Sequence, residues 1–298
     1  MLDVKIVRKV VSILNRYVSK RVKAKELSEQ KKWEKLFDTE GKFSSTIEKD
    51  LNMIFYKDSI LSKCIYSGFE KDEIEFVKRY LRQGDTFLDI GSNIGLFSLY
   101  AARVVGVSGK VIAFEPTPRT FERLNENIRL NQVDSIISQN NIGLSDADGV
   151  LKMNISSNGY DAWNTFANST DRKHDKQIEV PVKTLDNFLF EKNIDTSKIV
   201  LVKIDVEGWE VPVINGGVKL FLQDNAPVLM VEFTEENAFA AGSSCYELYD
   251  LVVSFGYKWF SYDVSTNMLM PDVKRLHYPY LNLIAIKNIE YVKKRLSS

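Results

Sequence analysis

Several features are scarce in this chain of 298 residues, and each scarcity excludes a class of protein. Its two cysteines, Cys64 and Cys245, are too few for a disulfide framework or a four-cysteine zinc site, and they favour a reducing compartment. Forty basic and forty acidic side chains give a net charge of zero, so the whole molecule has no overall attraction to nucleic acid or to an anionic surface. With only seven prolines and no internal repeat, the composition is that of an ordinary globular protein.

A long apolar run is also missing from the N-terminus. The segment Met1–Val7 is largely apolar, but Asp3 and Lys5 interrupt it and Arg8 follows it. It therefore has neither the core of a signal peptide nor the length of a transmembrane span. We expect a cytoplasmic protein without a transmembrane segment.

The first 25 residues combine basic side chains with apolar ones at helical spacing. The basic residues are Lys5, Arg8, Lys9, Arg16, Lys20, Arg21, Lys23 and Lys25, and the apolar ones are Val7, Val10, Val11, Leu14, Tyr17 and Val18. This pattern predicts a basic amphipathic helix, for which two interpretations stay open. The helix packs on the main domain or on a second copy of the chain, or it adsorbs as a peripheral element to the anionic inner face of the membrane.

The length predicts two domains, or one large α/β domain with an appendage. From about Glu26 to Gln83 the residues are typical of helices, and Gln83-Gly84-Asp85 ends this part. From Thr86 onward, short β-rich runs alternate with helical stretches. This alternation predicts a parallel sheet with crossover helices.

Four of these runs are almost wholly apolar, as expected of strands that are buried on both faces. They are Thr86–Ile90, Val111–Glu115, Ile199–Asp205 and Val228–Phe233. A carboxylate lies in or near the end of each run, respectively Asp89, Glu115, Asp205 and Glu232. Because open α/β sheets bind their ligands outside the carboxyl ends of the strands, we expect these acids to face one cleft.

Further strands are predicted around this core. Two late strands cover Tyr257–Tyr262 and Tyr280–Ile286. Residues 145–193 form a longer segment than a simple crossover needs, and they include the runs Val150–Ile155 and Ile178–Val182 on either side of a polar loop. We expect these two runs to be strands as well.

A glycine loop, Asp89-Ile90-Gly91-Ser92-Asn93-Ile94-Gly95, follows the first predicted strand and opens a helix. Glu115 lies about twenty residues beyond it, at the end of the next strand, where such folds bind a ribose. A dinucleotide site would have a glycine in place of Asn93, and Asp89 would repel a pyrophosphate. The loop therefore favours a cationic nucleoside without phosphate, such as S-adenosylmethionine.

Together with further motifs, this loop resembles the FkbM-type methyltransferases, a branch of the class I S-adenosylmethionine-dependent fold. The resemblance covers roughly residues 67–287 and includes Gly68-Phe69-Glu70, Phe87–Gly95, Phe114-Glu115-Pro116, Gly143–Asp146, Lys203–Glu210, Gly216-Gly217 and Val231-Glu232. It implies a Rossmann-like α/β fold, with a mostly parallel seven-stranded sheet whose last strand is antiparallel. It also implies a division into an N-terminal extension, residues 1–67, which we expect to be helical, and a methyltransferase domain, residues 68–298.

The resemblance further implies roles for individual residues. The cofactor-binding residues of the glycine loop would be Asp89, Gly91, Ser92, Asn93 and Gly95, which hold the methionine part, while Glu115 holds the ribose. Asn141 and Ser145 would lie beside the adenine, and Asp205 beside the sulfonium.

Methyl transfer to a hydroxyl needs a group that accepts the leaving proton, and Asp205 and Glu207 are the candidates for this general base. For Glu207 the alternative is a helix-terminal acid, favoured by the dipole of a helix beginning near Trp209. A third interpretation is that Asp205, Glu207 and Glu232 hold a magnesium ion, because this ion prefers carboxylate oxygens. The three interpretations stay open.

Aromatic side chains offer an acceptor surface, namely Tyr160, Trp163 and Phe166 in the long insertion and Trp209 beyond the fourth strand. The sequence as a whole predicts an S-adenosylmethionine-dependent O-methyltransferase. Its acceptor would be a hydroxyl of a sugar, as a nucleotide-sugar, a glycolipid or a growing glycan. The alternatives are O- or N-methylation of a small non-sugar metabolite, and a non-catalytic scaffold that works through its N-terminal helix. A nucleic-acid substrate is disfavoured because the predicted domain has no long basic stripe.

Overall fold

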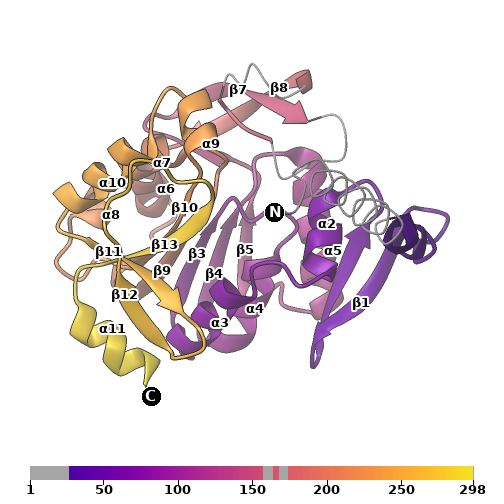
Figure 1. The fold of residues 1–298 in the computed structure, drawn as a ribbon, viewed down its shortest axis with the longest axis horizontal. Helices are drawn as coiled ribbons and strands as arrows, with labels where there is room; N and C mark the ends of the chain where they lie inside the picture. The colour runs from indigo at the N-terminus through magenta and orange to yellow at the C-terminus, as the bar shows by residue number, and fades with distance from the viewer. Residues whose placement is uncertain (1–26, 157–163, 168–173, 298) are drawn as a thin grey trace, which may run out of the picture.

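The four apolar runs form adjacent parallel strands at the centre of the computed structural model, which describes residues 27–156, 164–167 and 174–297 (Figure 1). These strands are β3 (Thr86–Ile90), β4 (Lys110–Phe114), β9 (Ile199–Ile204) and β10 (Val228–Phe233). Nearly all their residues are buried, because helices cover the sheet on both faces.

The remaining strands extend this sheet at both edges, in the order β12-β11-β13-β10-β9-β3-β4-β5. The added strands are β5 (Ile137–Asn140), β11 (Lys258–Asp263), β12 (Met268–Pro271) and β13 (Leu281–Ile286). Strand β5 is parallel to β4, whereas β13 is antiparallel to β10 and to β11. The mostly parallel Rossmann-like sheet with its antiparallel late strand is therefore confirmed.

The sheet has eight strands rather than the expected seven, because β12 pairs with β11 at the edge. The run Met268–Pro271 is only four residues long and ends in proline, so it gives a weak strand signal. An edge position tolerates that proline, since one side of the strand needs no partner. The tight turn before it includes Asn267 at φ +55°.

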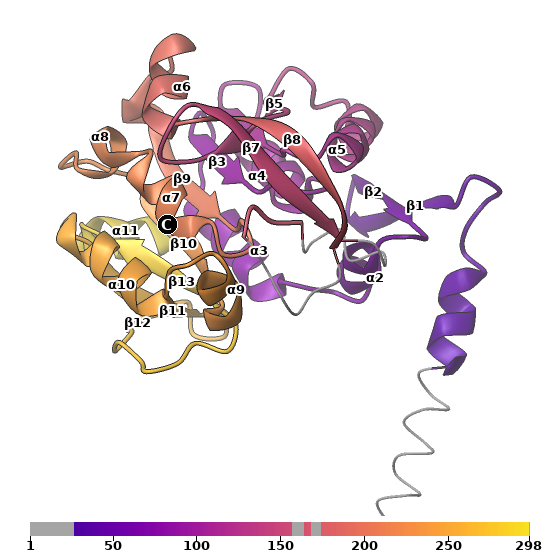
Figure 2. The same cartoon turned by 90° about the horizontal axis from the view of Figure 1, so that it is seen from above.

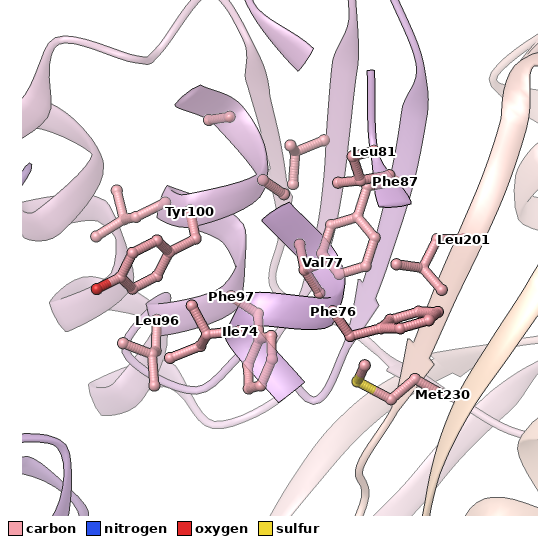
Figure 3. Close-up of a cluster of buried hydrophobic side chains, with 14 of the residues drawn as sticks. Ile74, Phe76, Val77, Leu81, Phe87, Leu96, Phe97, Tyr100, Leu201 and Met230 are labelled. Carbon is pink, nitrogen blue, oxygen red and sulfur yellow. The ribbon is translucent and has the colours of Figure 1, made fainter. Parts of the chain in front are cut away.

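Two hydrophobic cores lie on the two faces of the sheet, because successive side chains of each strand point to opposite faces. Phe87, Leu201 and Met230 belong to one core, and their neighbours Leu88, Val202 and Val231 belong to the other. Figure 3 shows Phe76 and Val77 pointing from a helix toward Phe87, Leu201 and Met230.

The first core is covered by α3 (Lys71–Tyr80), α4 (Leu96–Val105), α5 (Pro118–Asn131) and α11 (Ile289–Leu296). The second is covered by α6 (Leu185–Glu191), α7 (Glu210–Asn215), α8 (Val218–Phe221) and α10 (Cys245–Ser254). A short 3-10 helix, η2 (Thr196–Lys198), precedes β9, and α9 (Glu235–Ala240) follows β10.

The N-terminal extension departs from the expected all-helical segment. Residues 27–34 are helical and α2 (Ile60–Tyr66) is a helix, but β1 (Lys42–Glu48) and β2 (Leu51–Tyr56) form an antiparallel hairpin between them. The prediction of helix was wrong here, since Leu51, Met53 and Phe55 alternate with less buried residues in the two-residue period of a strand. The expected basic helix of residues 5–25 lies outside the described residues.

This hairpin packs on the sheet-covering helix α5, as Figure 2 shows from above. The side-chain oxygen of Asn127 accepts a hydrogen bond from the backbone nitrogen of Ile54 at 2.7 Å, and that of Asn131 accepts one from Asn52 at 2.9 Å. Trp33 and Phe55 belong to the same buried cluster as Phe87. A boundary at residue 67 stays a prediction, and one core runs across it.

The long insertion forms a separate three-stranded sheet beside the main one. Its strands are β6 (Gly143–Leu144), β7 (Gly149–Ser156) and β8 (His174–Lys183), so both strands predicted in this segment are confirmed. Tyr160 and Trp163 lie outside the described residues. Among the helices of the part of the chain described here, none combines the length and the apolar character needed to cross a membrane.

Candidate active site

A cavity of about 360 Å³ lies at the carboxyl ends of the central parallel strands. This volume is in the range of roughly 300–1,000 Å³ that is typical of small-molecule sites. Three of the four strand-end acids line it, namely Glu115, Asp205 and Glu232. The fourth, Asp89, is not among the lining residues, so the cleft expected from the sequence is present with one member missing.

The glycine loop forms one wall of this cavity through Gly91, Ser92 and Asn93. Gly91 has φ +83°, and a Cβ added there would lie 1.8 Å from the carbonyl oxygen of Asp205. Only glycine fits this close approach between the ends of β3 and β9. Gly95 lies deeper, at the N-cap of α4, and does not line the cavity.

Glu115 connects the loop to the next strand. Its carboxylate accepts hydrogen bonds from the backbone nitrogens of Asn93, at 3.1 Å, and Thr117, at 2.8 Å. These bonds hold a buried carboxylate, 5% exposed, at the cavity wall. Such a fixed acceptor suits a pair of ribose hydroxyls, the role that the sequence predicts for Glu115.

Asp89 lies behind the wall rather than in it. It is 1% exposed, and the Ser98 hydroxyl donates to its Oδ2 at 2.5 Å. Burial raises the pKa of this carboxyl, and the nearby ammonium of Lys203 opposes the rise. Its expected contact with the cofactor is therefore not supported by its position.

Lys203 is the buried cation of the site, 2% exposed at the end of β9. Its Nζ donates to Asp205 Oδ2 at 2.6 Å and lies 4.5 Å from the ring centroid of Phe97. Burial opposes its charged form, but the carboxylates of Asp205, Glu70 and Asp89 outweigh this and raise its pKa. One buried ammonium thus interacts with three carboxylates. The sequence analysis assigned no role to Lys203.

Beyond β9 the chain makes a tight turn that directs Glu207 into the cavity. Glu207 has φ +55°, and Asn237 donates to its Oε2 at 2.8 Å. Helix α7 begins only at Glu210, whose Oε1 accepts from the backbone nitrogens of Val206 and Gly208. The helix-terminal acid is thus Glu210 rather than Glu207, and burial raises its pKa to about 7.

Glu232 completes a group of three acids with Asp205 and Glu207. Each offers one carboxylate oxygen, and these oxygens all lie within 4.8 Å of one another. Thr234 donates to Glu232 Oε1 at 2.8 Å, while the buried Oε2 has no hydrogen-bond partner in the described part of the chain. Burial, together with the charges of the neighbouring acids, raises the pKa of Glu232 well above its usual value.

Glu70 also lines the cavity, although the sequence reasoning gave it no role in the site. It lies at the N-cap of α3 with φ +53°. The hydroxyl of Tyr280 donates to its Oε1 at 3.2 Å, and the amide of Asn282 donates to the same oxygen at 3.4 Å. Burial raises its pKa to about 7, with Lys203 opposing the rise.

Asn141 and Ser145, which were predicted to lie beside the adenine, do not line the cavity. The residues between them, Ile142, Gly143 and Leu144, do so. The Asn141 amide donates to the backbone oxygens of Glu115 and Pro116, at 2.8 and 3.1 Å. The Ser145 hydroxyl accepts from Nε1 of Trp209 at 3.2 Å. Both side chains therefore brace the wall, and contact with adenine stays a prediction.

Trp209 itself lines the cavity together with Phe166, and their ring centroids are 5.6 Å apart. The two rings therefore lie at the cavity wall, and their contact with an acceptor stays a prediction. The sequence does contain a signal for the role of Lys203. A lysine inside an otherwise apolar strand is rarely buried without a partner, so its position there indicates buried acids nearby.

Comparison with known proteins places this geometry in a family. The profile of the methyltransferase FkbM domain matches residues 89–259. Methyltransferase 1 of Beauveria bassiana is 33% identical over 148 residues, which cover 44% of this chain and 58% of that protein. The hexuronic acid methyltransferase AglP of Haloferax volcanii is 29% identical over 150 residues, covering 49% of this chain and 56% of that protein.

Among solved structures, the methyltransferase FkbM from Methylobacillus flagellatus superposes on 71% of this chain and 48% of its own, with a TM-score of 0.44 and 14% identity. The chain spans somewhat more than half the length of the two curated relatives that it matches.

Proposed function

Because the chain belongs to the FkbM methyltransferase family, we propose that it transfers a methyl group from S-adenosylmethionine to a hydroxyl of a sugar or glycan. The observation that carries this proposal is the shared cavity. The glycine loop and Glu115 line one part of it, and the acids Asp205, Glu207 and Glu232 line another. The residues that we propose for the nucleoside and those that we propose as proton acceptors therefore line one cavity.

Methyl transfer from a sulfonium to a hydroxyl is an in-line displacement, in which the oxygen attacks the methyl carbon and the C–S bond breaks. The protein contributes by aligning the two partners and by accepting the hydroxyl proton. Glu207 and Asp205 are the candidate bases. Asn237 donates a hydrogen bond to Glu207, and Lys203 donates one to Asp205. Glu232 joins them, because its raised pKa makes it the stronger proton acceptor once it is ionised.

Isosteric variants separate these bases. Replacing the carboxylate of the general base by an amide should lower the kcat of the enzyme by about 10²–10⁴-fold. E207Q, E232Q and D205N are compared in single-turnover reactions, with binding of S-adenosylhomocysteine as the measure that the cavity is intact. Loss of turnover in none of them would contradict general-base catalysis by these three acids.

The sugar acceptor rests on two observations. Carboxylates at the cavity wall can accept hydrogen bonds from several hydroxyls at once, and the rings of Trp209 and Phe166 offer a surface for the apolar face of a sugar. AglP, one of the relatives, is a hexuronic acid methyltransferase. We therefore propose a nucleotide-sugar, a glycolipid or a related hydroxyl-bearing molecule as the acceptor.

A panel of acceptors tests this proposal. The protein is incubated with S-adenosylmethionine that carries a labelled methyl group, together with nucleotide-sugars, free uronic acids and non-sugar alcohols and amines. Mass spectrometry then locates the label. Label on a sugar oxygen is the expected result, whereas label only on an amine or on a non-sugar metabolite would overturn it. Absence of any S-adenosylmethionine binding by calorimetry would instead favour a non-catalytic scaffold.

The alternative that we propose for Asp205, Glu207 and Glu232 is a magnesium site, in which the carboxylates bind the ion instead of accepting the proton. Magnesium binds oxygens at about 2.0–2.1 Å, so its ligand oxygens lie roughly 2.9–4.2 Å apart, and the oxygens of these acids, within 4.8 Å of one another, reach one ion after small side-chain rotations. The partnerless buried Oε2 of Glu232 is a second, independent observation, since a bound cation would satisfy it. Such an ion would orient two acceptor hydroxyls and favour ionisation of one of them.

The metal can be observed directly by titrating the protein with Mn²⁺ and recording its electron paramagnetic resonance. We expect one bound ion in the wild type and a loss of at least tenfold in affinity in E232Q. E236Q is the matched control, because Glu236 lies nearby in α9 and does not line the cavity. Full turnover in EDTA, or equal Mn²⁺ binding by wild type and E232Q, would remove the metal from the proposal.

For its location we propose the cytoplasm, with the basic segment of residues 5–25 as a peripheral contact to the inner membrane face or to a second copy of the chain. The basis is the sequence pattern of that segment and the low cysteine content of the chain. Liposome co-sedimentation of the full chain and of a variant that lacks the first 25 residues tests the membrane contact, and sedimentation velocity tests the oligomer. Unchanged behaviour in both would leave the segment without either role.

A further inference from the structure

The cavity contains a carboxylate that has no role in the reaction proposed above. Glu70 comes from the turn before α3, about twenty residues before the glycine loop, and it lines the same cavity as Gly91 and Asn93. Asp89, the acid that the motif assigns to the methionine part of the cofactor, is buried outside the cavity lining. The site therefore has an acid where the motif does not predict one.

The Glu70 carboxylate is held in place by donors in β13 and directly before it. Both hydrogen bonds that it accepts from described residues go to Oε1, from the Tyr280 hydroxyl and the Asn282 amide. Its second oxygen, Oε2, takes part in neither bond. Fixing one oxygen in this way orients the carboxylate and leaves the other for a ligand.

The charge around Glu70 is unbalanced. Lys203 is the buried cation that faces it, and this ammonium is already bonded to Asp205 at 2.6 Å while it also interacts with Asp89. Glu73, on the same helix as Glu70, adds a further negative charge. A second cation in the cavity would relieve this excess, and burial makes each such pairing stronger than in water.

S-adenosylmethionine carries two cationic groups, its sulfonium and the α-ammonium of its methionine part. The ammonium donates three hydrogen bonds, and a carboxylate is its strongest partner. We propose that Glu70, rather than Asp89, binds the α-ammonium group of the cofactor. This inference rests on the proposed use of S-adenosylmethionine, and it assigns to the turn before α3 the anchoring of the methionine part.

Asp89 then has a different task, which its contacts define. It accepts a hydrogen bond from Ser98 inside the protein and interacts with Lys203 from outside the cavity lining. In this arrangement Asp89 helps to keep Lys203 charged, and Lys203 in turn holds Asp205. Asp89 is thus a positioning residue, whereas Glu70 touches the cofactor.

Two ligands that differ in the amino acid part test the inference. S-adenosylhomocysteine keeps the α-ammonium but has a neutral sulfur, so any effect on its binding cannot come from the sulfonium. 5′-Methylthioadenosine keeps the nucleoside and sulfur and lacks the entire amino acid part. Binding of both ligands to wild type and E70Q is measured by calorimetry.

We expect E70Q to lower the affinity for S-adenosylhomocysteine by tenfold or more, equivalent to about 1.4 kcal/mol. The affinity for 5′-methylthioadenosine should stay within twofold of the wild-type value. E73Q is the matched control, since Glu73 shares the Asn282 amide with Glu70 but does not line the cavity. It should leave both ligands within twofold. E70D keeps the charge on a shorter side chain and should lose less affinity for S-adenosylhomocysteine than E70Q.

Thermal unfolding of each variant shows whether it is folded. Glutamine can still accept the bonds from Tyr280 and Asn282, so the fold should be kept. Equal weakening of both ligands by E70Q, or no weakening of S-adenosylhomocysteine, would overturn the inference and leave the proposed function standing. Failure of the wild type to bind either ligand would overturn both together.

Discussion

Replacement of Gly91 by alanine tests whether the close contact between the glycine loop and the end of β9 builds the cofactor site. A Cβ at this position would lie 1.8 Å from the carbonyl oxygen of Asp205, and real Cβ contacts essentially never fall below 3.0 Å. The loop and the strand end must therefore move apart. The substitution also forces alanine into a left-handed conformation at φ +83°.

Each effect has a known order of magnitude. A left-handed conformation costs a residue with a Cβ about 1–2 kcal/mol, and overpacking costs about 1–3 kcal/mol. We expect G91A to lose about 2–5 kcal/mol of unfolding free energy, a large part of the roughly 5–15 kcal/mol of a typical protein. Since a misplacement of about 1 Å can cost 10²-fold in rate, turnover should fall by about that factor in the folded variant.

Two other glycines separate the contributions. Gly242 has φ +81° but no atom within 4 Å of an added Cβ, so G242A measures the cost of the backbone conformation alone. Gly149 has neither the left-handed conformation nor a nearby atom, and G149A should stay within about 0.5 kcal/mol of wild type. Urea unfolding followed by tryptophan fluorescence gives all three values, and calorimetry gives the affinity for S-adenosylhomocysteine. A G91A protein as stable as G242A, with unchanged affinity, would refute the reasoning.

Four further variants probe other parts of the argument. E115Q should lower the affinities for S-adenosylhomocysteine and 5′-methylthioadenosine equally, by about ten- to a hundredfold in calorimetry. The reason is that a hydrogen bond to a charged group contributes about 1.5–3 kcal/mol. Unequal losses of affinity would place Glu115 away from the ribose. K203M should lose about 3–5 kcal/mol in urea unfolding at pH 8, because removal of the cation leaves buried carboxylates unpaired. The loss should be smaller at pH 5, where Glu70, whose pKa burial raises to about 7, is protonated. Burial raises the pKa of Glu210 from 4.5 to about 7, so the folded state binds this proton more tightly than the unfolded state does. The unfolding free energy of the wild type relative to E210Q should therefore fall by about 3 kcal/mol as the pH rises from 4.5 to above 7. W33A should lose about 3–5 kcal/mol in one cooperative transition, because Trp33 shares a core with the sheet, and a separate early transition would show that the extension unfolds alone.

The central strands and the glycine loop could be predicted because their signals are local. A strand that is buried on both faces must be apolar along its whole length, and a loop that meets a ligand at the end of such a strand needs glycine. Both properties appear in consecutive letters, as in the run from Phe87 to Gly95. The right-handed crossovers that parallel strands require then limit the topologies that these strands can adopt.

The hairpin β1–β2 was missed for the opposite reason. Its flanking segments are helical, and the alternation of Leu51, Met53 and Phe55 covers only a few residues between them. Part of the burial of those side chains comes from α5, which lies against β2 and comes much later in the chain. The strand signal is therefore weak locally and strong only in the folded state, where tertiary packing overrides helical propensity.

The roles of the acids depend on distances that no motif contains. The sequence shows Asp89 next to the glycine loop and Glu70 in a different motif, so the nearer acid is the natural choice for the cofactor. A strand, however, sends consecutive side chains to opposite faces, and Asp89 is carried into the protein interior, where it meets Ser98 and Lys203. The turn before α3 brings Glu70 to the cavity instead. The one sequence signal for this arrangement is Lys203 itself, because a charged residue within an apolar strand requires buried partners of opposite charge. These partners outnumber the cation, and this excess of negative charge is what we propose a cationic ligand to offset.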